Sequence, residues 1–164
     1  MSNYKIIDNF LNKDEFKIIK DTFLLDNKFP WYYSDVVSHY NKDDDGFYFE
    51  HHFYNKYTPL SNWFNVINSL ILSKLDINAL IRVKGNLYSK TEKVITHDMH
   101  VDYDIPHKGA LYSLNTCNGF TTLEDGTKIK SIANRILLFD SSKLHCSSTC
   151  TDQKRRVNFN INYL

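Results

Sequence analysis

The sequence predicts a mainly β protein with α-helices near its N-terminal end, built as an antiparallel double-sheet jelly roll. Two helical patterns lie in the first half of the 164-residue chain, and about eight short strand patterns follow them. No helical pattern of about 10–15 residues separates these strands, which argues against parallel βαβ units. Such a run of short strands favours an arrangement of two packed antiparallel sheets, with the helices outside.

The composition is that of one folded domain. The chain has 42% hydrophobic and 15% aromatic residues with only 5 Gly and 3 Pro, so most of it is expected to be regular structure. We treat residues 1–164 as a single domain, with a helical N-terminal part over about 1–77 and a β core over about 78–164. The net charge of +1 gives no electrostatic reason to expect binding to nucleic acid or to an anionic membrane.

The N-terminus and the cysteines favour a cytoplasmic protein without a membrane partner. No apolar stretch reaches the roughly 20 residues of a transmembrane helix. Residues 1–5 lack the apolar core of a secretion signal. Cys117, Cys146 and Cys150 contain no C-x-x-C pair, and an odd number of cysteines is a poor disulfide framework. We therefore expect a reducing compartment.

Both helices are predicted from their first residues and their apolar spacing. Asn12 and Glu15 form a capping box for a helix over about residues 13–24. Ser61 is expected to cap a second helix, whose apolar side chains recur on one face as far as Leu75.

An aromatic region over about residues 29–54 separates the two helices and is expected to be irregular. Within it, Trp31–Tyr33 suits either a substrate lid with aromatic walls or a packed N-terminal layer. His51 and His52 suit either metal ligands or structural side chains. The sequence leaves these alternatives open.

Strands are predicted where apolar and β-branched residues recur between turn signals. Asn118–Gly119 and Glu124–Gly126 mark two such turns, and the second belongs to a hairpin. The predicted strands cover Tyr4–Asp8, Leu80–Tyr88, Gly109–Asn115, Phe120–Leu123, Thr127–Ile132, Ile136–Phe139 and Arg156–Tyr163.

The stretch over residues 97–104 holds two histidines and three aspartates, including the metal-ligand spacing His100-x-Asp102. On an extended backbone, residues i and i+2 point the same way, so this imidazole and this carboxylate can meet one ion. His145 follows a short apolar strand and is the candidate third ligand. Two histidines and one carboxylate on one face of an ion are typical of non-haem Fe(II) oxygenases, with zinc and a water as the rival occupant.

The predicted C-terminal strand alternates between an apolar and a polar face. Arg156 leads the polar face and is followed by Asn158, Asn160 and Asn162. A guanidinium inside a small barrel is suited to hold a carboxylate bidentately, which favours an oxygenase with a dicarboxylate co-substrate over a zinc hydrolase. A register slip of one residue would exchange the two faces and put Arg156 on the surface.

Several short motifs follow one another in the second half of the chain. They are Asn86-Leu-Tyr88, His100-x-Asp102, Tyr112-Ser-Leu-Asn115, Asn134-Arg-Ile-Leu-Leu-Phe139, His145 and Arg156-Val157. Their ordered combination resembles the 2-oxoglutarate/Fe(II)-dependent oxygenases, and it is most similar to small prolyl-hydroxylase-like members, including those that phages encode. The resemblance covers about residues 78–164, and more loosely Phe29–Tyr33. It implies a double-stranded β-helix, the jelly-roll or cupin-like form, flanked by about two helices.

By this resemblance, His100, Asp102 and His145 bind Fe(II), which 2-oxoglutarate also chelates. The reaction would use O2 to hydroxylate a protein side chain or a small molecule, with release of succinate and CO2. Ascorbate is expected as an auxiliary reductant. The location would be the cytoplasm, of the host cell if a phage encodes the chain.

The resemblance also implies which residues bind 2-oxoglutarate. Arg156 would hold its distal carboxylate, helped by the hydroxyl of Tyr112. Tyr88 and, more weakly, Asn86 would line the same pocket. The spacing from His145 to Arg156 is 156 − 145 = 11 residues, longer than expected for prolyl hydroxylases, so Arg155 stays an alternative clamp.

Other functions and other site residues stay open. Residue 162 is Asn where many prolyl hydroxylases carry Trp, so a peptide substrate is not implied by that position. A nucleic-acid base hydroxylase or demethylase could stack a base on Trp31–Tyr33. A cupin-like binding protein without catalysis is the other alternative. His97 and Cys146 are weaker ligand candidates, while Tyr103 and Asp104 could face the substrate.

Overall fold

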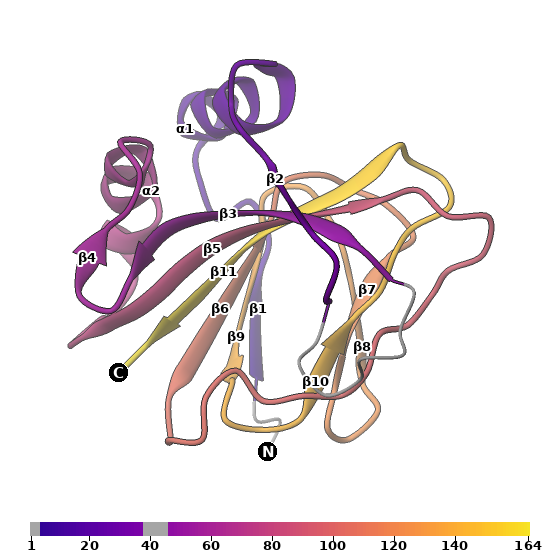
Figure 1. Ribbon diagram of the computed structural model, residues 1–164. Helices are drawn as coiled ribbons and strands as arrows, with labels where there is room; N and C mark the ends of the chain where they lie inside the picture. Colours follow the sequence, from indigo (N-terminus) through magenta and orange to yellow (C-terminus); the bar gives the residue numbers. More distant parts are fainter. Residues whose placement is uncertain (1–3, 38–45) are drawn as a thin grey trace.

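Two antiparallel sheets face each other in the computed structural model, which describes residues 4–37 and 46–164 (Figure 1). The larger sheet contains, in spatial order, β1 (Tyr4–Ile7), β9 (Arg135–Asp140), β6 (Lys108–Ser113), β11 (Arg155–Tyr163), β5 (Leu80–Ser89), β3 (Tyr48–Asn55) and β2 (Tyr32–Ser34), with β4 (Thr58–Pro59) paired to β3. The smaller sheet contains β10 (His145–Ser147), β7 (Phe120–Leu123) and β8 (Lys128–Lys130). The predicted double-stranded β-helix is confirmed.

A segment outside the named strands extends the smaller sheet beside β10. Thr96 forms an antiparallel bridge with Ser148, and His100 forms one with His145. The stretch that carries the histidines and aspartates is therefore held against β10 by backbone hydrogen bonds, although it is too irregular to be a full strand.

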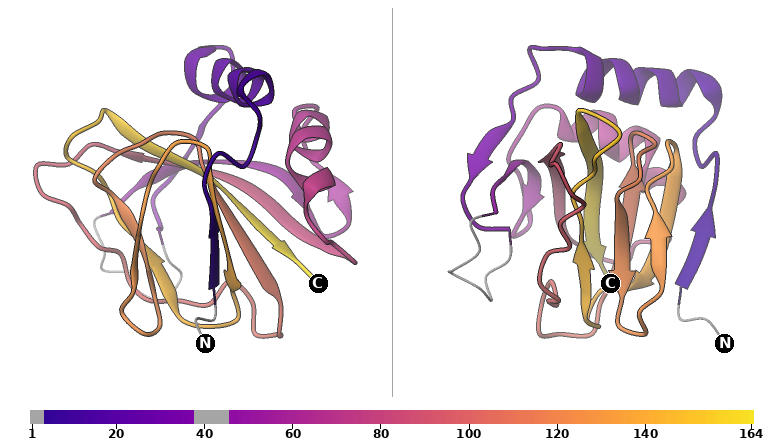
Figure 2. Two further views of the ribbon diagram at one scale, coloured as in Figure 1. Left: turned by 180° about the vertical axis from the view of Figure 1, so that it is seen from behind. Right: turned by 90° about the vertical axis from the view of Figure 1, so that its right-hand side faces the viewer.

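Helical segments cover the outer face of the larger sheet (Figure 2). They are α1 (Lys13–Lys20), the π-helical η1 (Asp21–Leu25), α2 (Phe64–Leu70) and the 3₁₀-helical η2 (Leu72–Lys74). The predicted capping box is present, because Asn12 Oδ1 accepts from the Glu15 amide at 2.9 Å and Glu15 accepts from the Asn12 amide at 3.0 Å. None of the helices in the described ranges is long and apolar enough to span a membrane.

The N-terminal part contributes strands as well as helices, which corrects one expectation. β1 pairs with β9, and β2 and β3 extend the larger sheet beyond β5. The expected irregular region over residues 29–54 is wrong at β3, whose backbone groups complete the hydrogen bonding of β5. The part over 1–77, expected to be helical, contains β1 to β4 as well as the helices. Residues 38–45 of that region lie outside the described residues.

Alternation along the strands separates an apolar layer from a polar one. Val157, Phe159 and Ile161 of β11 pack in the main core with Ile19 of α1 and Ile67 of α2. The intervening residues of β11 face the smaller sheet. A smaller apolar cluster occupies part of the space between the sheets and consists of Leu123, Ile129, Leu137 and Phe139.

Asn134 fastens the N-terminal segment to the larger sheet. Its side chain accepts from the Leu11 amide at 2.9 Å and donates to the Leu11 carbonyl at 2.8 Å. The Tyr112 hydroxyl donates to the same Asn134 oxygen at 2.9 Å. The residue has φ of 61°, a left-handed conformation that asparagine tolerates better than most residues.

Replacing Asn134 should therefore destabilise the whole fold. We expect Asn134→Ala to lower the free energy of unfolding by about 3 kcal/mol or more, since buried backbone groups of Leu11 lose their partners. Tyr112→Phe removes only one of these bonds and should cost about 1 kcal/mol. Urea denaturation of both variants measures the difference. Equal costs for the two variants would contradict this role for Asn134.

Candidate metal centre

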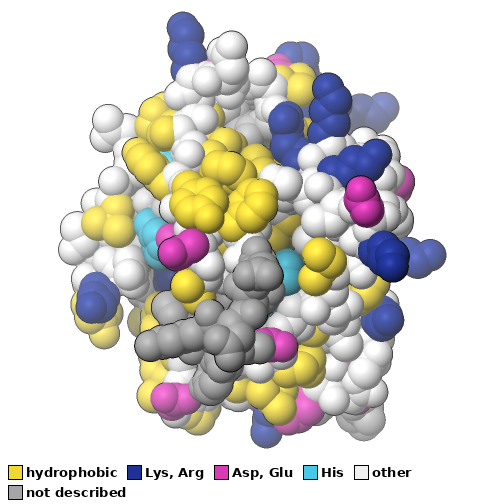
Figure 3. Space-filling model, turned by 45° about the vertical axis from the view of Figure 1, so that its right-hand side comes forward, with side chains coloured by type: hydrophobic (Ala, Val, Ile, Leu, Met, Phe, Trp, Pro, Cys, Tyr) yellow, Lys and Arg dark blue, Asp and Glu magenta, His cyan; other side chains and the backbone are white. Residues whose placement is uncertain are grey.

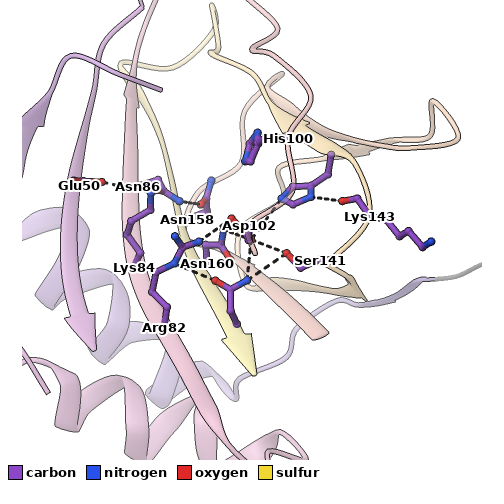
Figure 4. Close-up of polar contacts among 12 residues, drawn as sticks. Glu50, Arg82, Lys84, Asn86, His100, Asp102, Ser141, Lys143, Asn158 and Asn160 are labelled. Carbon is purple, nitrogen blue, oxygen red and sulfur yellow. Dashed lines mark hydrogen bonds and ion pairs between the residues drawn. The ribbon is translucent and has the colours of Figure 1, made fainter. Parts of the chain in front are cut away.

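Three predicted ligands meet between the two sheets. One nitrogen of each imidazole of His100 and His145 and one carboxylate oxygen of Asp102 all lie within 4.8 Å of one another. His145 Nε2 lies 3.6 Å from Asp102 Oδ2, and the two imidazole centroids are 4.8 Å apart. The smaller sheet supplies His145, and the segment bridged to it supplies His100 and Asp102, which are labelled in Figure 4.

Backbone contacts orient both imidazoles for metal binding. The amides of His100 and His145 each donate to the other residue's carbonyl at 2.9 Å. His100 Nδ1 lies 3.1 Å from the Asp98 carbonyl, and His145 Nδ1 lies 2.9 Å from the Lys143 carbonyl. Since carbonyls only accept, each Nδ1 carries the proton and each Nε2 is left with a lone pair for an ion.

Four donors from two strands and one turn surround the Asp102 carboxylate. Arg82 Nη2 donates to Oδ1 at 2.8 Å. Oδ2 accepts from Ser141 Oγ at 2.6 Å, from Asn162 Nδ2 at 2.8 Å and from Asn160 Nδ2 at 3.2 Å. Figure 4 shows Arg82, Ser141 and Asn160 around Asp102. The carboxylate is thereby fixed in one orientation.

Electrostatics keep Asp102 and His100 in their metal-binding forms. Burial raises the pKa of the Asp102 carboxyl, but the His145 imidazole 3.6 Å away and the charge of Arg82 outweigh this, so that the pKa lies well below its ordinary value. Burial, followed by the charge of His145, lowers the pKa of His100. Asp102 is therefore anionic and His100 neutral near pH 7.

A small cavity lies beside this cluster, and Arg156 contacts two of the residues that line it. Its lining includes Asn86, Tyr88, Thr121 and His145. The Arg156 side chain is fully buried, donates to Thr121 Oγ1 at 2.8 Å and to the Ser148 carbonyl at 2.9 Å, and lies 5.7 Å from the Tyr88 ring centroid. Among the described residues, Arg156 Nε has no hydrogen-bond partner. The arginine thus places a positive charge directly behind Tyr88 and Thr121, which line the cavity.

A second pocket of about 310 Å³ opens on the other side of the ligands, toward solvent. Glu50, His52, Lys84, His100 and Asp102 are among its lining residues. Burial and then the charge of Arg82 lower the pKa of Lys84 to about 8. The hydrogen bond from His52 is the largest cause that lowers the pKa of Glu50 to about 2. The pocket is polar and carries charges of both signs.

Exposed aromatic side chains lie on and next to the strands β2 and β3. Tyr32 and Tyr33 are 60% and 64% exposed, and the Tyr33 ring lies 5.8 Å from Phe47 and 6.0 Å from Phe49. Figure 3 shows hydrophobic side chains gathered near the centre of one face of the molecule. Trp31 instead packs against the main core. The segment Trp31–Tyr33 therefore combines a packed residue with two exposed ones.

Tyr112 does not reach the predicted position, and that expectation is wrong. Its hydroxyl donates to Asn134, and its ring belongs to the main core beneath the helices. Tyr112 pairs with Phe159 on β11, so both side chains lie on the face opposite to Arg156. The neighbouring residue Leu111 lines the cavity instead. Strand parity would have predicted this.

The remaining candidate residues lie outside the cluster of metal ligands. Arg155 donates to the Leu24 carbonyl, on the helical side of the sheet and away from the cavity. His51 is buried between the Pro30 carbonyl and Ser61 Oγ, each 2.8 Å from one of its ring nitrogens. His97 lies 2.7 Å from Ser147 Oγ and stacks near Tyr88. Neither His97 nor Cys146 is part of the ligand cluster.

Several residues that contact the ligands or line the outer pocket were not predicted from the sequence. Tyr103 lies under the Arg82 guanidinium at 5.2 Å, whereas Asp104 is exposed. The sequence reasoning overlooked Arg82, Lys84 and Ser141, which contact the ligands or line the outer pocket. Arg82 and Lys84 share the strand parity of Asn86 and Tyr88, so the alternation of β5 contained the signal.

Comparison with known proteins shows similarity in structure. No protein-family model matches the sequence, and no curated protein matches it. A Pseudomonas putida prolyl-4-hydroxylase superposes with a TM-score of 0.65 at 13% identity, over 98% of this chain and 92% of that one. The viral collagen prolyl hydroxylase vCPH of Paramecium Bursaria Chlorella virus-1, in complex with 2OG, gives 0.61 at 15% identity, over 99% and 96%. HygX of Streptomyces hygroscopicus, with nickel and 2-oxoglutarate bound, gives 0.62 at 11%, over 99% and 82%.

These likenesses extend over nearly the whole chain and over most of each compared structure. They confirm, at the level of the fold, the resemblance that the sequence motifs indicated. The chain has the fold of the prolyl-hydroxylase-like 2-oxoglutarate/Fe(II) oxygenases.

Proposed function

We propose that the protein is an Fe(II)-, 2-oxoglutarate- and O2-dependent oxygenase that hydroxylates a protein side chain or a small molecule and releases succinate and CO2. One observation carries the proposal. The cluster of His100, Asp102 and His145 lies between an outer pocket that opens to solvent and a small cavity, and the buried Arg156 donates to Thr121 in the wall of that cavity. One side suits a carboxylate co-substrate and the other suits a substrate.

The ligand set fits Fe(II). Two imidazoles, whose Nδ1 atoms contact backbone carbonyls and whose Nε2 atoms are available to an ion, and one carboxylate are the facial arrangement of non-haem iron oxygenases, and they leave further coordination positions open. When bound, Fe(II) supplies the O2 chemistry and 2-oxoglutarate the electrons. The contribution of His100, Asp102 and His145 is to hold the ion, and that of Arg82 and the β11 asparagines is to orient Asp102.

The inner cavity fits 2-oxoglutarate. Arg156 is a buried cation whose described partners are neutral oxygens and whose Nε has none among the described residues, so it lacks the anion that a buried charge requires. The distal carboxylate of 2-oxoglutarate would supply that anion. Tyr88 and Asn86 would line the space between this carboxylate and the ion.

The outer pocket supports a protein or small-molecule substrate over nucleic acid. Its cations are paired, because Arg82 contacts Asp102 at 2.8 Å and Lys84 lies 3.5 Å from Glu50. Phosphate contacts dominate nucleic-acid affinity and need unpaired basic residues. Ascorbate has no support in the described residues or in the compared structures, and the cytoplasmic location and phage origin stay predictions.

Metal and co-substrate binding can be tested together. Under anaerobic conditions, Fe(II) and then 2-oxoglutarate should produce a weak visible charge-transfer band, and succinate should form once O2 and a substrate are present. His100→Ala should lower succinate formation by more than about a hundredfold, since changes outside the ligand set already cost about 10–100-fold. His97→Ala, in the same stretch but outside the cluster, should keep the band. Absence of the band from the unaltered protein would refute the proposal.

Substitutions of the neighbouring residues Arg156 and Arg155 form a matched pair that tests which arginine binds 2-oxoglutarate. Arg156→Gln should weaken 2-oxoglutarate binding by about 10–100-fold, because a hydrogen bond to a charged group contributes about 1.5–3 kcal/mol. Arg155→Gln should leave that affinity unchanged, since its side chain points to the helical side. Anaerobic titration calorimetry with the metal-loaded protein measures both. The reverse result would make Arg155 the clamp.

Orientation of Asp102 by Arg82 should be visible in metal affinity. We expect Arg82→Gln to weaken Fe(II) binding by about 10–100-fold, because partners that fix a metal ligand are worth this much. Arg135→Gln removes an arginine that pairs with Asp8 far from the cluster and should have no such effect. Equal metal affinities in the two variants would show that Arg82 does not orient Asp102.

A further inference from the structure

A second group of metal-binding side chains lies outside the candidate oxygenase site. Cys117 lies in the connection between β6 and β7, and Cys150 and Asp152 lie in the connection between β10 and β11. One carboxylate oxygen of Asp152 and the sulfur atoms of both cysteines all lie within 4.8 Å of one another. Both cysteines are buried, whereas Asp152 is exposed to solvent. Two of the three cysteines of the chain thus converge across 33 residues of sequence, since 150 − 117 = 33.

The two connections are already held together before any ion binds. The Asn118 amide donates to both carboxylate oxygens of Asp152, at 3.0 and 3.1 Å. The Asn118 side chain donates to Thr151 Oγ1 at 2.7 Å and accepts from the Thr151 amide at 2.9 Å. These bonds fix the carboxylate beside the two sulfur atoms, and each of its oxygens keeps a lone pair free. The site is therefore preorganised for a third partner.

We propose that Cys117, Cys150 and Asp152 bind a thiophilic divalent cation such as Zn²⁺, at a site distinct from His100, Asp102 and His145. Two thiolates and a carboxylate are a donor set that zinc accepts and that hard cations such as Mg²⁺ or Ca²⁺ do not. Water can complete a tetrahedral shell, because Asp152 is exposed. This assignment does not rest on the proposed oxygenase function.

The surroundings of the thiols favour a metal site over two separate thiols. Both cysteines are buried beside an exposed carboxylate that the Asn118 amide already holds in place. A bound cation would displace the thiol protons and stabilise both thiolates directly.

The proposed zinc site lies close to the buried side chain of Arg156. A Cβ atom built on Gly119 would lie 2.8 Å from Arg156 Cδ and 3.4 Å from Cys117 Sγ, so the arginine and the thiol both lie against the side-chain face of Gly119. Ser148, which accepts from Arg156, lies two residues before Cys150. A cation here would therefore fix both connections that surround the guanidinium, and its net negative ligand set would lie close to a buried positive charge.

Titration with Co²⁺ in the absence of oxygen, with a non-thiol reductant present, tests this site. Thiolate ligands give an intense near-ultraviolet charge-transfer band with Co²⁺, whereas imidazole and carboxylate ligands do not. The unaltered protein should bind two Co²⁺ ions, one of them with this band. Cys117→Ser and Cys150→Ser should each abolish the band, and Cys146→Ser, the matched control, should keep it. His100→Ala should keep the band while losing the other ion.

The Asp152→Asn variant distinguishes loss of ion binding from misfolding, because it leaves both thiols in place. It should weaken the binding of the ion with the thiolate band at least tenfold, with an unchanged circular dichroism spectrum. Absence of the band from the unaltered protein, or its survival in both Cys117→Ser and Cys150→Ser, would overturn the proposal. Loss of two free thiols to a disulfide without any band would also overturn it. Because the thiolate band needs no 2-oxoglutarate, failure of the oxygenase proposal would leave this result readable.

Discussion

The antiparallel pairing of β11 between β5 and β6 is the constraint on which the candidate site depends. In this register Arg156 is opposite Tyr88, Asn158 opposite Asn86, and Asn162 opposite Arg82. All six side chains consequently face the space between the two sheets. Shifting β11 by one residue would turn the polar face toward the helices and bury Val157 and its apolar neighbours between the sheets, so the apolar core and the site enforce the same register.

Charge compensation explains how this polar interior is tolerated. Asp102 is buried, but four donors satisfy its oxygens and Arg82 balances its charge. Lys84 and Glu50 form a comparable pair at the outer pocket. Arg156 differs, since its described partners are neutral. One uncompensated buried cation behind the wall of a cavity is a local cost to stability that a bound dicarboxylate would offset.

The sequence predicted the features that depend on local residue patterns. It did not predict features that depend on which segments lie side by side in the folded protein. The strands β5 to β9 and β11, the capping box of α1 and the meeting of His100, Asp102 and His145 all followed from alternation, capping residues and spacing. β3 was missed because its alternating aromatic and polar residues lie inside a wider aromatic region, so its two faces did not stand out. Tyr112 was placed by family resemblance against its own strand parity, and the parity was right.

By itself, the sequence determined which side chains share a face of each strand and which residues can bind a metal, because both are properties of residue type and of a period of two. Only the tertiary structure decided which faces meet. It placed Arg82 on Asp102, sent Arg155 to the helical side, and brought Cys117 beside Cys150. These contacts join residues 20 to 131 positions apart, and such proximity comes from the order of strands in a sheet, which no local pattern encodes.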